Sequence, residues 1–318
     1  MIGRGRETEM LIPNGRRSPQ RPTVSRESAR DAIVGVWPQF ETAAVEFLAQ
    51  GWDFCAFLVA ETWIFRFSKH DGSTRKLQME SNLLPDLGER ISLRIPKYEY
   101  ALSLEPNHRR PFAGYRKLPG SSGDVSKTVD RPMVARQLGL FLSELHAYPI
   151  AKARRAAVPQ ENQGTASWRD RALGQLAALE VDLEMPSAVL QKYLIEELPP
   201  SYPGSPRLVH NDLWPEHVLL DPGSGQVSGV IDWADAVIGD PARDFSCLFA
   251  WFGEGWLEEV LASYSGDPDS GVMARSRYLT VCHSMHVASL SQELPQEQWI
   301  EAARRALRWV FGDGDRVS

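Results

Sequence analysis

The spacing of hydrophobic residues predicts helix first and strand next in the early part of the chain. Residues 25–50 carry apolar positions at near-helical spacing, so a helix is expected there, broken in two by Pro38. Aromatic and β-branched residues then dominate 52–60 and 62–67, which favours a hairpin with its turn at Glu61. This change of period at Gly51 marks the start of a small sheet.

The segment that follows is expected to add one helix and two more strands. A loop at 70–73 precedes a predicted helix that ends near Leu87, with apolar residues on one face. Short strands are expected at about 98–104 and 112–117. The first part of the chain is therefore predicted to be a sheet with one conspicuous helix.

Beyond about residue 118, helical spacing dominates. A helix is expected to begin at 130–132, because Asp-Arg-Pro is typical of a helix start and an apolar stripe follows it. A strand pair at 218–220 and 227–231 is expected on either side of the Pro-Gly-Ser-Gly turn. The other predicted helices are 165–183, 187–197, 243–252, 255–264, 271–290 and 296–310.

This pattern predicts an α+β protein of two lobes. We expect a flexible basic tail at 1–24, a sheet-containing lobe at 25–117 and a mainly helical lobe at 118–318. The boundary between lobes is placed at Leu-Pro-Gly-Ser-Ser-Gly, 118–123, because this composition suits a hinge.

Composition narrows the class of protein. The 318 residues are 43% hydrophobic and 24% charged, an ordinary globular balance, and the net charge of -6 argues against a nucleic-acid partner. The chain lacks a secretory signal and an apolar run long enough for a membrane span, and its three cysteines form no CxxC pair. These features indicate a cytoplasmic protein without a membrane partner, and we expect a monomer.

Candidate chemistry gathers around the predicted hairpin. Pairing through the turn sets Asp221 opposite Gln226, so His217 is expected near Val230, within two residues of Asp232 across the strands. Asp212 lies on the loop just before. Two carboxylates and one imidazole should therefore meet at one end of the hairpin.

Three interpretations of this cluster compete. Each residue alone could be an ordinary polar group at a turn or strand end, although burying several charged groups together is costly. The set His210, Asp212, His217 and Asp232 could hold a transition metal for hydrolysis. In phosphoryl transfer, Asp212 would orient and deprotonate a hydroxyl while His217 and Asp232 hold the Mg²⁺ of a nucleotide. Because imidazole binds Mg²⁺ poorly, the chemistry alone somewhat favours the second.

A family resemblance decides between them. His210-x-Asp212, His217, the hairpin with Ile-Asp-Trp-Ala-Asp-Ala at 231–236, and Gly-Asp-Pro-Ala-x-Asp at 239–244 resemble the active-site block of aminoglycoside phosphotransferases. The resemblance implies a protein-kinase-like fold, with Asp212 as catalytic base and His217 and Asp232 on Mg²⁺. The usual residue at 217 is Asn, and His is similar to the variant in macrolide 2′- and aminoglycoside 2″-phosphotransferases.

The same resemblance assigns a nucleotide site in the first lobe. Arg66 stands in register with the usual phosphate-binding lysine, with Glu80 as its helix partner, and Lys69 and Lys76 are the fallback cations. The hinge that reads the purine is expected at Tyr115, Arg116, Lys117 and Leu118, and either ATP or GTP could be the donor. Because Arg66 and His217 depart from the usual residues, a nucleotide-binding pseudokinase is the alternative.

The acceptor is expected against the helical lobe. Asp235, Glu254 and Glu258 could meet a cationic substrate, although Glu on the wet face of an amphipathic helix is a common structural feature. The residues of these motifs favour an aminoglycoside as the acceptor, which would imply a role in antibiotic resistance. A macrolide is the next candidate acceptor. A metabolic amino sugar or amino alcohol is a further alternative because the fold serves many hydroxyls.

Overall fold

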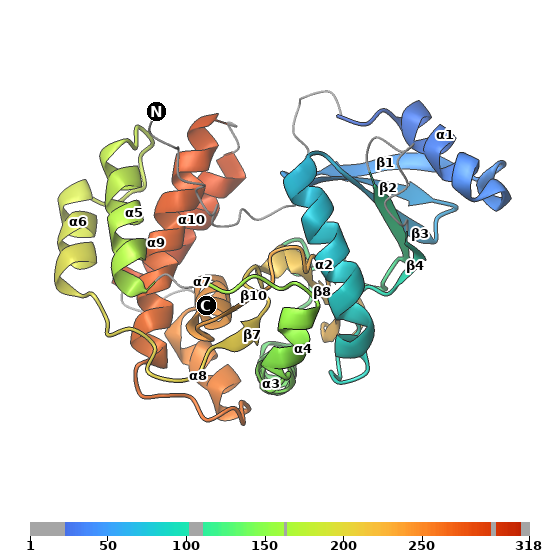
Figure 1. Cartoon of the computed structure of the whole chain (residues 1–318). Helices are drawn as coiled ribbons and strands as arrows, with labels where there is room; N and C mark the ends of the chain where they lie inside the picture. The colour runs from blue at the N-terminus through green and yellow to red at the C-terminus, as the bar shows by residue number, and fades with distance from the viewer. Residues whose placement is uncertain (1–22, 102–110, 162–163, 294–296, 313–318) are drawn as a thin grey trace, which may run out of the picture.

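The protein consists of two lobes with a cavity between them (Figure 1). The computed structural model describes residues 23–101, 111–161, 164–293 and 297–312. Most of the predicted tail, residues 1–22, and part of the predicted strand at 98–104 lie outside this range. The bilobal, kinase-like fold expected from the sequence is confirmed.

The first lobe is built on a five-stranded antiparallel sheet, with strand order β1-β2-β3-β5-β4. Its strands are β1 (Val45–Gln50), β2 (Phe54–Val59), β3 (Trp63–Ser68), β4 (Tyr98–Ala101) and β5 (Phe112–Arg116). The helix α1 (Arg26–Val36) and the 3-10 turn η1 (Pro38–Phe40) cover one face through an aromatic core that includes Phe57, Phe65 and Phe112. Leu77 of the helix α2 (Asp71–Gly88) packs with Phe54 and Ala113 of the sheet.

Two details of this lobe differ from the prediction. The helix stops at Val36, and 45–50 form the edge strand β1 instead of a second helix. Antiparallel pairing of Val45 with Val59 and of Phe47 with Phe57 outweighs the weak helical spacing of this short segment. Residues 71–73, predicted as loop, are the first turn of α2, since the His70 side chain caps that helix by accepting from the Ser73 N–H at 3.2 Å.

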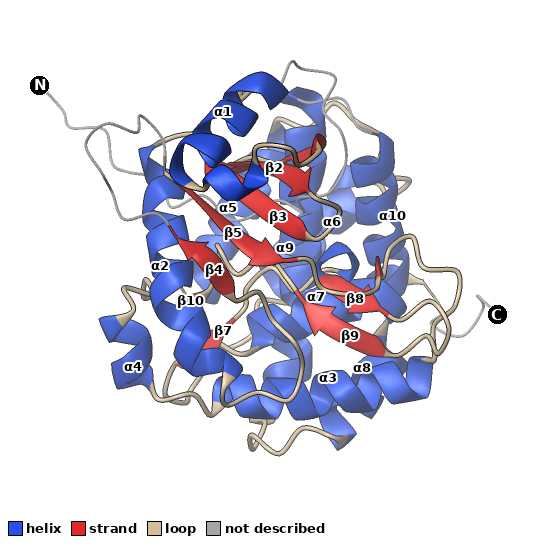
Figure 2. Ribbon diagram, turned by 90° about the vertical axis from the view of Figure 1, so that its right-hand side faces the viewer, coloured by secondary structure: helices blue, strands red, loops and turns tan. Residues whose placement is uncertain are grey.

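The second lobe is mainly helical, as predicted (Figure 2). Its helices are α3 (Arg131–His146), α4 (Ile150–Arg155), α5 (Thr165–Ala177), α6 (Ser187–Glu196), α7 (Ala242–Phe252), α8 (Glu254–Ala262), α9 (Val272–Glu293) and α10 (Glu297–Phe311). The short helix α4 is not anticipated from the sequence. No helix in the described ranges combines the length and apolarity needed to cross a membrane.

Two small sheets flank the segment that contains Asp212, His217 and Asp232. The strands β7 (Arg207–Val209) and β10 (Val237–Gly239) form one, and β6 (Ser121–Ser122), β8 (Val218–Leu220) and β9 (Val227–Val230) form the other. The predicted hairpin forms, but its register was wrong by one residue. Val218 pairs with Val230 because an irregularity between Leu219 and Leu220 absorbs the extra residue. The N–H of Ile231 thus donates to the carbonyl of His217 at 2.9 Å.

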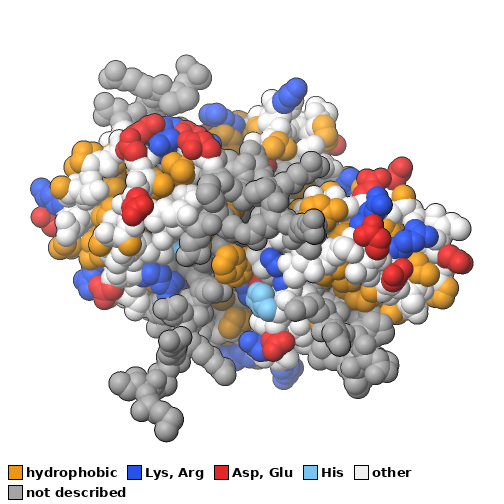
Figure 3. Space-filling view, turned by 90° about the horizontal axis from the view of Figure 1, so that it is seen from above, with side chains coloured by type: hydrophobic (Ala, Val, Ile, Leu, Met, Phe, Trp, Pro, Cys, Tyr) orange, Lys and Arg blue, Asp and Glu red, His pale blue; other side chains and the backbone are white. Residues whose placement is uncertain are grey.

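Acidic and basic side chains are mixed on the upper face of the molecule. Seen from above, Asp and Glu side chains are interspersed with Lys and Arg on the part of this face that described residues form (Figure 3). The net charge of -6 is therefore not gathered there into one acidic patch.

Candidate active site

The loop that carries Asp212 is fixed in place by a buried carboxylate. Asp244, near the start of α7, accepts the backbone N–H of His210 at 3.1 Å and that of Asn211 at 2.7 Å. It also contacts Nε2 of His146 at 3.1 Å, so His146 is a hydrogen-bonded residue of the core. Asn211 adopts a left-handed φ of 68°, and its amide donates to the carbonyl of Asp235 at 3.0 Å. The loop conformation is thus set before any substrate binds.

The catalytic candidate Asp212 lies fully buried at the end of this loop. Neither carboxylate oxygen makes a hydrogen bond within the described residues, but one of them lies 3.3 Å from Nδ1 of His217. Burial, together with the neighbouring carboxylates of Asp235 and Asp232, raises the pKa of Asp212 well above its ordinary value, while His217 opposes that rise. A buried carboxylate in this state favours uptake of a proton from a reacting group.

His217 and Asp232 meet as predicted despite the shifted register. His217 Nε2 lies 3.6 Å from an Asp232 carboxylate oxygen, and His217 Nδ1 contacts the Asp212 carbonyl at 2.7 Å. Burial alone would lower the pKa of His217, but Asp212 and Asp232 outweigh it and raise this pKa to about 9. Asp232 has a left-handed φ of 63°, a strained conformation often found at functional sites.

The cation predicted on β3 is joined to both lobes. Arg66 donates to the Glu80 carboxylate at 2.7 and 3.0 Å and to Asp232 at 2.8 Å, and it is itself buried. Glu80 also accepts the backbone N–H of Trp233 at 3.2 Å. The predicted Arg66–Glu80 pair therefore forms and extends to the segment that carries Asp232.

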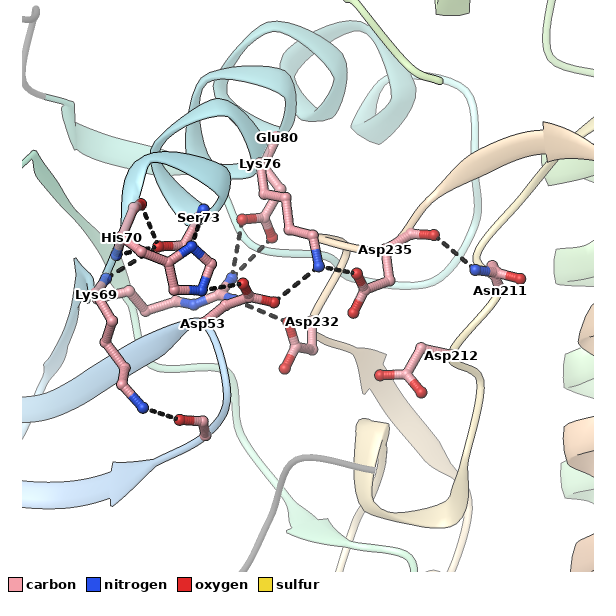
Figure 4. Close-up of polar contacts among 12 residues, drawn as sticks. Asp53, Lys69, His70, Ser73, Lys76, Glu80, Asn211, Asp212, Asp232 and Asp235 are labelled. Carbon is pink, nitrogen blue, oxygen red and sulfur yellow. Dashed lines mark hydrogen bonds and ion pairs between the residues drawn. The ribbon is translucent and has the colours of Figure 1, made fainter. Parts of the chain in front are cut away.

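A second ionic group beside it was not assigned from the sequence. Lys76 on α2 donates to Asp53 at 2.8 Å and to Asp235 at 2.5 Å, so it joins the turn between β1 and β2 to the segment after Asp232 (Figure 4). Lys69, the other fallback cation, donates instead to the carbonyl of Gly51 at 2.9 Å. The turn contains Trp52 and Asp53, but no spacing in the sequence relates Asp53 to Lys76.

The predicted nucleotide residues surround an interlobe cavity of about 420 Å³. Arg66, Tyr115, Lys117 and Leu118 line it, together with His217 and Asp232. Glu80 does not line the cavity itself but holds Arg66, which does. The Arg116 side chain is exposed and lies over the Trp63 ring at 4.7 Å, so a purine contact would have to come from its backbone.

A smaller cavity of about 220 Å³ adjoins the catalytic loop on the side of the helical lobe. Trp214, Pro215 and Glu216 form one wall, and residues of α9 and α10 form the other. Glu216 lines both cavities, which therefore lie on either side of the segment that follows Asp212, although Asp212 itself lines neither. Neither cavity is lined by the predicted acceptor residues Glu254 and Glu258, which are exposed on α8; Glu254 pairs with Arg277 at 3.5 Å.

The donor set suits a cation that arrives with a nucleotide. Within the described ranges, no group of three or more His, Cys, Asp or Glu side chains is arranged to hold a metal ion by itself. Asp232 offers a carboxylate, and His217 would offer a nitrogen once a bound cation displaces its ring proton. Mg²⁺ commonly takes few protein ligands and completes its shell with phosphates and water. These residues therefore fit a Mg-nucleotide better than a resident transition metal.

Comparison with known proteins agrees with this geometry. Residues 44–278 match the model of the phosphotransferase enzyme family, APH. Viomycin phosphotransferase of Streptomyces vinaceus is 32% identical over 173 residues, 52% of this chain and 58% of that protein. The uncharacterized protein YcbJ of Bacillus subtilis (strain 168) is 32% identical over 109 residues, 33% of this chain and 35% of that protein. Both matches span less than two thirds of the relatives' length.

Solved structures extend the similarity over most of the chain. The GDP complex of wild-type aminoglycoside 2′-phosphotransferase-IIIa has a TM-score of 0.70 at 27% identity, covering 89% of this chain and 97% of that one. The GDP and kanamycin complex of APH(2″)-IIIa has a TM-score of 0.69 at 27% identity over 87% and 95%. Macrolide 2′-phosphotransferase MphH from Brachybacterium faecium shares the fold, with a TM-score of 0.65 at 22% identity over 87% and 98%. The protein belongs to the APH phosphotransferase enzyme family.

Proposed function

We propose that the protein is a kinase that transfers the γ-phosphate of ATP or GTP to a hydroxyl of an antibiotic of the aminoglycoside class. One observation carries the proposal. Asp232 is bonded to Arg66, which Glu80 orients, and both Asp232 and Arg66 line the interlobe cavity. Asp212 is linked to Asp232 through His217, which lies 3.3 Å from the one carboxylate and 3.6 Å from the other. This is the set of groups that phosphoryl transfer uses: a base, a metal ligand and a fixed cation.

The chain's own residues would act in a simple sequence. The nucleotide fills the interlobe cavity, where Arg66 presents a guanidinium to its phosphates. Asp212 aligns the acceptor hydroxyl and takes its proton as the oxygen bonds to the γ-phosphorus and the bond to the β-phosphate oxygen breaks. His217 and Asp232 would hold Mg²⁺, which neutralises phosphate charge when bound.

A second acceptor is supported by one comparison. Viomycin phosphotransferase shares 32% identity with this chain over 173 residues. Viomycin and the aminoglycosides are cationic, and the wall of the smaller cavity carries three acidic residues, Asp124, Glu216 and Glu301, against one basic residue, Arg305. Viomycin is therefore the second candidate acceptor. A macrolide is a further alternative, and the excess of acidic residues in this wall favours it less than the cationic antibiotics.

The exchange Asp212→Asn tests the proposal. We expect wild-type protein with Mg²⁺ and ATP or GTP to add one phosphate to kanamycin, streptomycin or viomycin, detected by mass spectrometry. Loss of the base should lower kcat by about 10²–10⁴-fold with the melting temperature kept. Asp221→Asn is the matched control, because Asp221 caps the exposed hairpin turn at 2.8 Å from the Ser224 N–H and lines neither cavity. Wild-type turnover in Asp212→Asn would overturn the proposal.

A further inference from the structure

The smaller cavity is lined by a residue whose polar group has no hydrogen-bond partner among the described residues. Trp214 follows the catalytic Asp212 by two residues, is 8% exposed and lines this cavity. Its indole Nε1 is buried and no acceptor among the described residues lies within hydrogen-bond distance. Indole N–H is a donor only, and a buried donor without an acceptor is costly. A ligand in the cavity could supply the missing acceptor.

A second unpartnered atom lies beside it on another element. The His283 ring of α9 packs on the Trp214 ring with centroids 4.2 Å apart and planes at 31°, and both residues line the cavity. His283 Nε2 is likewise buried without a hydrogen-bond partner. Burial, with His286 and Arg243 nearby, lowers the pKa of His283 well below its ordinary value, so the ring is neutral.

We propose that Trp214 and His283 form a subsite that binds a neutral hydroxyl of the acceptor, and so select a hydroxylated ring in addition to any cationic contacts. This inference rests on the proposed kinase function, because the cavity reaches the catalytic loop through Glu216. It names a recognition contact that the kinase reaction itself does not require.

The chemistry of the two atoms selects a hydroxyl over other groups. An ammonium ion has donors only and cannot satisfy the Trp214 N–H. A carboxylate would accept that bond, but three acidic residues of the cavity wall, Asp124, Glu216 and Glu301, outnumber its one basic residue, Arg305, and disfavour a second negative charge. A hydroxyl accepts from Trp214 and either donates to His283 Nε2 or accepts from it, so it matches both tautomers of the imidazole.

The indole N–H signal of Trp214 gives a direct test with the full chain. Protein labelled with ¹⁵N in its tryptophan side chains is titrated with kanamycin, 2-deoxystreptamine and myo-inositol, which carry hydroxyls, and with 1,5-diaminopentane, which carries only ammonium groups. Trp214→Phe identifies the signal. We expect at least one hydroxylated probe to shift it and the diamine to leave it unchanged.

Affinity measurements then separate the contact from the fold. Trp214→Phe keeps an aromatic ring but removes the N–H. We expect this variant to bind the hydroxylated probe about tenfold more weakly than wild type and to bind nucleotide unchanged. His283→Leu should lower the affinity for the probe by a similar factor. This second variant keeps the test valid if Trp214→Phe folds poorly. Trp309→Phe is the matched control, because Trp309 Nε1 is also buried without a partner but lines neither cavity.

Each outcome decides the inference independently of the kinase reaction. The inference is overturned if no hydroxylated probe shifts the Trp214 signal, if the diamine shifts it equally, or if both variants bind as wild type. Phosphate transfer that continues unchanged in both variants would overturn the subsite and leave the proposed function standing. A probe that binds through Trp214 without any transfer would support the subsite and remove the proposed function.

Discussion

The loop around Asp212 is held mainly through its backbone. Asp244 of α7 fixes the backbone of His210 and Asn211, while the Asp212 carboxylate makes no hydrogen bond among the described residues and lies 3.3 Å from His217. In the proposed reaction, the acceptor hydroxyl would supply a hydrogen bond that this carboxylate lacks. The loop is thus stabilised by a side chain of α7, and its own carboxylate is left for the proposed reaction.

Burial of His210 predicts a stability change in a defined pH window. Burial lowers the pKa of His210 to about 4 from an ordinary 6.5, so between these values the unfolded chain binds the proton and the folded protein does not. This contribution to stability is complete above pH 6.5 and is lost as the pH falls toward 4. The exchange His210→Asn removes it.

Urea denaturation at several pH values measures the effect. The difference in unfolding free energy between wild type and His210→Asn should shrink by about 3 kcal/mol as the pH falls from 7 to 4, since other groups cancel in the comparison. A difference that stays constant across this window would show that His210 is not neutral in the folded protein.

The contacts of site residues could be predicted from the sequence where these residues lie close together along the chain. Asp212, His217 and Asp232 flank one hairpin, so even a register wrong by one residue left them adjacent. Lys76 and Asp53 could not be paired in this way. Their contact with Asp235 depends on how the two lobes meet, and no local spacing encodes that.

At the scale of elements, long periodic helices were predicted well and short segments poorly. α3 and α9 follow their apolar patterns, whereas 45–50 became a strand because pairing with β2 decides its conformation. The helix α4 was missed because its six residues are too short for a periodic signal.

Two helix glycines should respond to alanine with opposite signs. A Cβ at Gly139 of α3 would lie 2.3 Å from the Val260 carbonyl oxygen of α8, so Gly139→Ala forces the helices apart and should cost about 1–3 kcal/mol. Gly174 of α5 is exposed and a Cβ there meets nothing within 4 Å, so Gly174→Ala should stabilise by about 0.5–1 kcal/mol. Chemical denaturation of both variants measures this, and equal effects would contradict the packing of α3 on α8.

For the whole molecule, α2 joins the lobes at several points along its length. Lys76 and Glu80 reach the second lobe from its first turns and its middle, and Asp86 does so near its end, where it accepts from Lys152 of α4 at 2.7 Å. The same helix also carries the carboxylate that orients Arg66. Any change in the contact of α2 with the second lobe should therefore alter the phosphate site.

Lys76 gives this interlobe contact a measurable signature. Lys76→Met removes the lysine that the buried carboxylates of Asp53 and Asp235 share and leaves Asp53 with the His70 imidazole at 3.3 Å, so at pH 8 we expect a loss of about 1–3 kcal/mol in unfolding free energy. Burial already raises the pKa of Asp235, and removal of Lys76 should raise it further, so protonation on lowering the pH to 6 should reduce the loss. The exposed pair Lys192–Glu196 supplies the control, since Lys192→Met should cost little at either pH. A loss in Lys76→Met that is equal at both pH values would mean that the side chain contributes through packing alone, and that charge does not hold the lobes together at this point.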